Sequence, residues 1–71
     1  MDESKNKKIF DTLYIHISNA SLIMGLKEKT LENRILNGKL TGTKIGRSWY
    51  VTESNIKDYL NEMTKFGTAT A

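Results

Sequence analysis

The sequence of 71 residues contains no cysteine and a single histidine, His16. Without cysteine the chain forms neither a disulfide nor a cysteine-ligated zinc site, so its stability must come from apolar packing. A lone histidine without HExxH-type spacing does not predict a metal site. No run approaches the ~20 apolar residues that span a bilayer. The charged start is not followed by the apolar segment of a secretory signal, so we expect a cytoplasmic protein.

Sequence motifs of catalysis are also missing. The stretch from Gly42 to Gly46 lacks the GK[ST] ending and the strand-to-helix context of a phosphate-binding loop. The serines have no histidine or lysine at a spacing that suggests nucleophilic catalysis. We therefore expect no enzyme, no cofactor and no small-molecule substrate.

The charges are unevenly distributed. The block from Lys27 to Arg47 contains six cations and two anions, so its net charge is +4, whereas the net charge of Glu53 to Glu62 is −2. One basic side and one acidic side are expected of a small protein that meets a polyanion. A solvated surface of mixed charge would look the same, so charge alone leaves both interpretations open.

The stretch that follows Lys39 predicts a basic β-hairpin. Residues 43–45 and 49–51 are short β-prone runs, and Gly46, Arg47 and Ser48 between them have the chemistry of a turn. A cation lies at the tip. A helix-turn-helix pattern lies directly upstream, and this adjacency predicts a winged helix.

Two short helices make up the helix-turn-helix pattern. Ser18 is a candidate N-cap for a first helix over about 19–24, and Gly25 ends it by allowing the left-handed conformation. The second helix covers about 28–37 and is closed by Gly38, after which Leu40 folds back onto the core.

The second helix has one apolar direction, defined by Leu31 and Ile35. Arginine and asparagine read guanine and adenine in the major groove, while lysine and threonine reach phosphates. The opposite face and one flank carry these residue types, namely Lys29, Thr30, Asn33, Arg34 and Asn37. Glu32 and Leu36 lie along the other flank. A solvated helix face would look similar, and only the neighbouring hairpin favours the DNA-binding interpretation.

The remaining elements complete a small α+β domain. Thr52 is the expected cap of a third helix, whose buried stripe comprises Ile56, Tyr59, Leu60 and Met63. The β-prone run 14–17 is expected to add a third strand to the hairpin, while Ile9, Phe10 and Leu13 pack on the domain. The predicted fold is a winged helix-turn-helix with three helices and a two- to three-stranded antiparallel sheet. It occupies residues 9–64, between disordered tails at 1–8 and 65–71.

The run from Tyr14 to Leu60 resembles the excisionase-type helix-turn-helix family, which is related to the MerR N-terminal domain. The resemblance rests on an ordered set of short motifs: an opening strand, Met24-Gly25-Leu26, Thr30 followed by an apolar residue, Gly38-Lys39-Leu40, and Lys44-Ile45-Gly46-Arg47 followed by Trp49. It implies sequence-specific binding of duplex DNA, with the second helix in the major groove and the hairpin on a flanking backbone or minor groove. The implied helix contacts are Lys29, Thr30, Asn33 and Arg34, and the implied wing contacts are Lys44, Arg47 and Ser48.

Several positions depart from the family pattern. Lys27 stands where Ser or Thr usually caps the recognition helix, so this helix lacks a standard cap. Leu36 stands at a commonly polar position and Arg34 at a commonly apolar one. If Leu36 is buried, Arg34 turns further toward DNA; alternatively, Leu36 contacts a partner. Leu22 also replaces a polar residue, and either the segment around Phe10 or a second protein would cover it.

Three functions remain open. The first is an architectural protein of a mobile element, which bends DNA beside a recombination site and assembles an integrase, with neighbouring copies on the DNA. The second is a small transcriptional regulator, or the DNA-binding subunit of a phage or plasmid machine. The third is a protein-interaction module with an apolar patch of Leu22, Leu36 and Tyr50.

Overall fold

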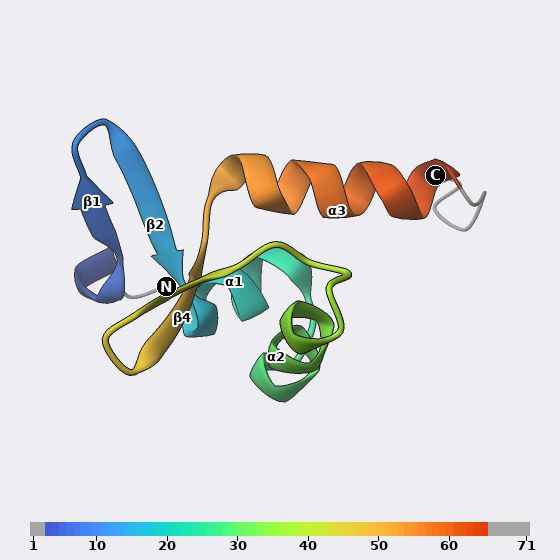
Figure 1. The fold of residues 1–71 in the computed structure, drawn as a ribbon, viewed down its shortest axis with the longest axis horizontal. Coiled ribbons are helices and arrows are strands. Elements are labelled where there is room, and N and C mark those ends of the chain that lie inside the picture. The colour runs from blue at the N-terminus through green and yellow to red at the C-terminus, as the bar shows by residue number, and fades with distance from the viewer. Residues whose placement is uncertain (1–2, 66–71) are drawn as a thin grey trace.

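The chain folds as two β-hairpins and three α-helices in the computed structural model, which describes residues 3–65 and the side chains of residues 4–62. In chain order the elements are a short 3₁₀ helix (Glu3–Lys5), β1 (Lys7–Ile9), β2 (Thr12–His16), α1 (Ile17–Met24), α2 (Glu28–Leu36), β3 (Thr43–Ile45), β4 (Ser48–Val51) and α3 (Glu53–Lys65) (Figure 1). The predicted α+β winged helix-turn-helix with three α-helices is thus confirmed. Of the predicted C-terminal tail, Lys65 belongs to α3 and residues 66–71 lie outside the described part.

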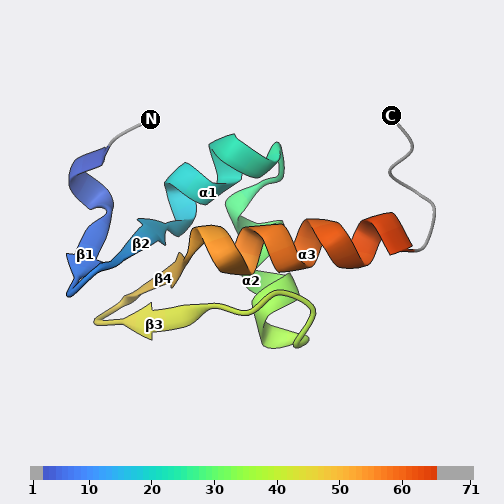
Figure 2. The same cartoon turned by 90° about the horizontal axis from the view of Figure 1, so that it is seen from above.

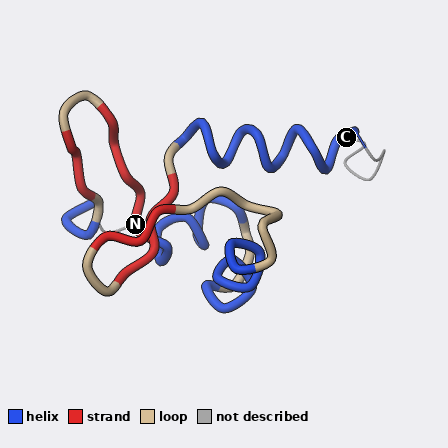
Figure 3. The backbone as a smooth tube through the Cα atoms, viewed as in Figure 1, coloured by secondary structure: helices blue, strands red, loops and turns tan. Residues whose placement is uncertain are grey.

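The strands form one antiparallel sheet in the order β1-β2-β4-β3, so the two hairpins meet through β2 and β4 (Figure 3). Ile15 pairs with Val51 and His16 with Tyr50, which confirms that the strand before the first helix joins the predicted hairpin. The sheet has four strands instead of two or three, because β1 extends it by one strand.

The N-terminal segment is not the disordered tail that its composition predicted, at least from residue 3 onward. Residues of β1 pair with β2, for example Lys7 with Tyr14. The carboxamide oxygen of Asn6 accepts hydrogen bonds from the backbone N–H of His16 (2.9 Å) and from the side-chain amide of Asn19 (2.8 Å). These contacts hold the segment against the start of α1.

The first helix begins earlier than predicted, at Ile17. Its N-cap is His16 and not Ser18, because the His16 Nδ1 accepts the free backbone N–H of Ser18 at 3.1 Å. The predicted end is confirmed: Gly25 adopts φ 70°, and the N–H groups of Gly25 and Leu26 both donate to the carbonyl of Ser21.

The core lies between the sheet and the three helices. Its buried side chains are Ile15, Ile17, Ala20, Leu31, Leu40, Val51, Ile56 and Tyr59. The predicted stripe of α3 is correct for Ile56 and Tyr59 but wrong for Leu60, which is 48% exposed. The helix continues beyond the sheet (Figures 1 and 2), so its distal turns have less to pack against. The side chain of Met63 lies outside the described residues.

Candidate nucleic-acid interface

Helix α2 is the predicted recognition helix, and its ends are formed largely as expected. Lys27 occupies the N-cap position without a side-chain hydrogen bond, so the first-turn N–H groups receive no side-chain cap. At the other end Gly38 adopts φ 78°, and the N–H groups of Lys39 and Leu40 donate to the Arg34 carbonyl. Leu40 folds back and is only 1% exposed. The chain therefore reverses sharply at the end of α2 and returns toward the sheet.

The face of α2 that points away from the core is exposed. Leu31 is fully buried and Ile35 packs beside it, whereas Lys29, Asn33 and Asn37 on the opposite face are exposed. Thr30 lies on a flank and is half-buried. The structure thus brings one ammonium group and two carboxamides together on one accessible helix face, which is suitable chemistry for the major groove.

The structure excludes one of the two alternatives for Leu36, namely its burial. Arg34 is half-buried, and its Nε is buried without a hydrogen-bond partner in the described part of the chain, whereas Leu36 is 70% exposed. At about 100° per residue, Arg34 lies about 80° from the packed direction of the helix and Leu36 about 120°. Burial of Leu36 is therefore wrong, and Arg34 is not turned outward. The helical wheel already contained the signal that Leu36 belongs to the accessible surface.

The wing is the β3–β4 hairpin. Its turn has two residues, Gly46 and Arg47, enclosed by the pair Ile45 and Ser48. Gly46 has φ 63°, and a positive φ at the first turn position suits the right-handed twist of a hairpin. Arg47 at the tip is exposed, and Ser48 is half-buried.

The base of the wing is held by Trp49. This ring is half-buried and packs against the core, and the exposed Lys44 extends over it with Nζ 5.5 Å from the ring centroid. A cation at this distance from the face of an indole is attracted by the ring. The Lys44 ammonium is thereby positioned on the wing.

Helix α2 and the wing lie on the same side of α3 in two perpendicular views (Figures 1 and 2). The β1–β2 hairpin instead rises to the level of α3 in Figure 1. Lys29, Asn33, Lys44 and Arg47 therefore belong to elements that share one side of the molecule. The predicted helix and wing contacts are compatible with a single duplex on this side.

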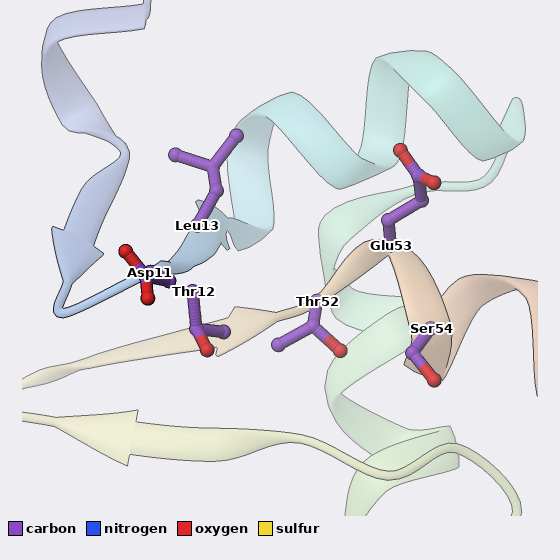
Figure 4. Close-up of a pocket in the computed structure, with 6 residues that line it drawn as sticks. All are labelled: Asp11, Thr12, Leu13, Thr52, Glu53 and Ser54. Carbon is purple, nitrogen blue, oxygen red and sulfur yellow. The ribbon is translucent and has the colours of Figure 1, made fainter.

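A shallow pocket lies elsewhere, between the tip of the β1–β2 hairpin and the start of α3 (Figure 4). Its lining is acidic and hydroxylic, comprising Asp11, Thr12, Leu13, Thr52, Glu53 and Ser54. Two carboxylates repel phosphate, and no residue of α2 or the wing lines this pocket. The pocket is not part of the candidate interface.

The apolar patch expected for a protein-interaction module does not form as predicted. Leu22 and Leu36 are 66% and 70% exposed, but Tyr50 is only 5% exposed and its ring packs edge-on against His16 at 5.3 Å. Phe10 was expected to pack on the domain and is 94% exposed, with Ile9 at 40% and Leu13 at 47%. None of the three is buried, so the expectation that they pack on the domain is wrong.

The described residues form neither a metal site nor a membrane-spanning helix. No group of three or more potential metal ligands lies together among them. None of their helices has the length and apolar character needed to cross a membrane.

A family model described as a helix-turn-helix domain matches residues 14–64, more than two-thirds of the chain. The chain belongs to this family. The match covers both helices of the motif, the wing and most of α3, and agrees with the excisionase-type resemblance of the sequence. No curated protein and no solved structure matches the chain. The chain is a DNA-binding helix-turn-helix protein.

Proposed function

We propose that this chain binds a specific duplex DNA sequence and acts as an architectural factor of the excisionase type in a mobile element. Helix α2 enters the major groove, and the β3–β4 wing contacts the flanking backbone or minor groove. The protein acts without catalysis. Its partners are duplex DNA, an integrase or recombinase, and neighbouring copies on the same DNA.

The observation that carries this proposal is the shared side of α2 and the wing (Figures 1 and 2). The exposed Asn33 of α2 supplies a carboxamide, which reads adenine, while Lys29 beside it supplies charge for phosphates. The wing adds Lys44 and, at its tip, Arg47. An exposed arginine at a hairpin tip fits the negative potential of a narrow minor groove.

Binding is tested by titrating labelled duplex and single-stranded DNA with the protein at salt concentrations from 50 to 200 mM. If the basic side neutralises four to five phosphates, the slope of log K against log salt is about −4 per bound monomer. A slope near zero, or tighter binding to single strands, contradicts the proposal. A duplex of random sequence serves as the control for specificity.

The architectural role has its own test, which uses fluorescence resonance energy transfer between dyes at the two ends of a duplex that carries a selected site. Bending brings the ends together and increases the transfer, and a duplex without the site shows no increase. Specific binding without a change in transfer would favour a transcriptional regulator or the DNA-binding subunit of a phage or plasmid machine.

A further inference from the structure

Leu36 is an apolar side chain on the exposed face of the recognition helix. It is 70% exposed, although it terminates a helix whose other accessible positions carry polar or charged groups. Relative to Asn33, which points directly away from the core, Lys29 lies about 40° to one side and Leu36 about 60° to the same side. Lys29 and Leu36 are two turns apart, about 10.5 Å along the helix axis. Leu36 is therefore part of the surface that α2 presents to a duplex.

A leucine has no hydrogen-bonding group, so few features of the major groove attract it. The C5-methyl group of thymine is the apolar feature on the floor of that groove. Above cytosine, the same side chain would meet a hydrogen at C5 and would desolvate the N4 amino group without replacing its hydrogen bond. Above thymine, by contrast, the leucine and the methyl group are both removed from water.

Arg34 does not occupy the part of the α2 surface where Leu36 lies. Arg34 is half-buried and its Nε is buried, whereas Leu36 is open to solvent. The accessible face of α2 is consequently formed by Lys29, Asn33, Leu36 and Asn37. Leu22 is similarly exposed, but it belongs to α1 and lies outside the face that α2 presents.

We propose that Leu36 is a specificity-determining residue that reads the methyl group of one thymine in the major groove. This inference rests on the proposed function, because it requires α2 to lie in that groove. Leu36 thus supplies apolar discrimination of thymine from cytosine, beside the hydrogen bonds that Asn33 offers to adenine.

The test begins with a duplex selected from a random pool by the full chain. Each thymine of that duplex is then replaced in turn by deoxyuridine, which lacks only the methyl group. For the parent protein, we expect one position at which the replacement weakens binding about fourfold, the equivalent of one buried methyl group. For Leu36→Ala, the same replacement has no effect. Leu22→Ala is the matched control, because it removes an equally exposed leucine from another helix and keeps the fourfold effect.

In a second measurement, the T·A pair at the sensitive position of the duplex is replaced by a C·G pair. The parent binds this duplex more weakly than the selected one. Replacing the cytosine with 5-methylcytosine restores about fourfold of the parent's affinity, whereas the affinity of Leu36→Ala does not change. If the parent binds the selected duplex but no thymine shows a methyl effect, or if Leu36→Ala keeps that effect, the inference is wrong while the proposed function stands. If the parent selects no duplex at all, the proposed function fails and the inference fails with it.

Discussion

The backbone of Gly42 lies directly against the side chain of Ile35. A Cβ atom at Gly42 would be 2.7 Å from Ile35 Cδ1 and 2.9 Å from its Cγ1, closer than side-chain carbons normally approach. Gly42 belongs to the loop that leads from α2 to β3, and Ile35 belongs to the last turn of α2. The recognition helix and the loop that leads to the wing are therefore in contact at a position that only glycine fills without displacement.

Replacing Gly42 with alanine should move the loop away from α2 or displace Ile35. We expect Gly42→Ala to lower the free energy of unfolding by about 1–3 kcal/mol, as overpacking does in other cores. The effect should be much smaller in an Ile35→Ala background, where the colliding carbons are gone. Chemical denaturation measures the interaction energy between the two positions from the parent, both single variants and the double variant. Strictly additive effects would contradict the contact between Gly42 and Ile35.

Base readout and backbone positioning should be separable on the candidate interface. Asn33→Ala is expected to reduce discrimination between the selected and a random duplex by about 1–3 kcal/mol, because its carboxamide is accessible at the centre of the recognition face. Lys44→Ala should weaken binding to both duplexes equally, since a contact to phosphate carries no sequence information. Parallel titrations of each variant with the two duplexes measure both affinities. If Asn33→Ala lost the same affinity for both duplexes, Asn33 would not read a base.

The elements with a local signal could be predicted from the sequence, and those held by distant contacts could not. Gly25 and Gly46 mark the end of α1 and the wing turn because a positive φ is needed at those positions. The first strand has no such signal. Its lysines are typical of a solvated, disordered tail. The segment is held in place by Asn6, whose partners His16 and Asn19 are 10 and 13 residues away in the sequence. No periodicity or propensity reports a contact of this kind.

The same reasoning applies to the candidate site. The outward direction of α2 followed from Leu31 and Ile35, so the exposure of Lys29, Asn33 and Asn37 could be predicted. The helical wheel also places Arg34 nearer than Leu36 to the packed direction, but how deeply each side chain is buried depends on tertiary packing. Tertiary packing has no local signal in the sequence, so the burial of the Arg34 Nε could not be predicted.

Asn6 should contribute measurably to stability. Asn6→Ala removes the acceptor for the His16 backbone N–H and for the amide of Asn19, a residue that is only 1% exposed. We expect a loss of about 1–3 kcal/mol in the free energy of unfolding, measured in urea. Lys5→Ala, an exposed neighbour, is the matched control and should have little effect. An unchanged midpoint for Asn6→Ala would show that the N-terminal hairpin adds nothing to the domain.

Phe10 is a source of strain at the tip of the β1–β2 hairpin. It adopts φ 55° and is 94% exposed, so its ring gains little from packing while its Cβ is crowded by the backbone. Phe10→Gly should therefore stabilise the domain by about 1 kcal/mol, which corresponds to a rise of roughly 4–8 °C in Tm. Phe10→Ala removes the ring but keeps the Cβ, and should give no such gain. A lower Tm for Phe10→Gly would mean that the ring stabilises the fold.

Replacing Trp49 and Arg47 should affect different properties, because Trp49 packs the wing against the core and Arg47 is exposed at the wing tip. Trp49 is half-buried against the core, so Trp49→Ala should lower stability toward the smaller end of the ~3–5 kcal/mol range of core aromatic truncations. Arg47 is exposed in the turn, and Arg47→Ala should leave Tm unchanged but weaken DNA binding, most strongly where the flank is rich in A·T pairs. Thermal melting and DNA titration of both variants separate the two effects. If Arg47→Ala binds an A·T-flanked site as tightly as the parent, the hairpin does not contact the minor groove, since no other cation lies in its two-residue turn.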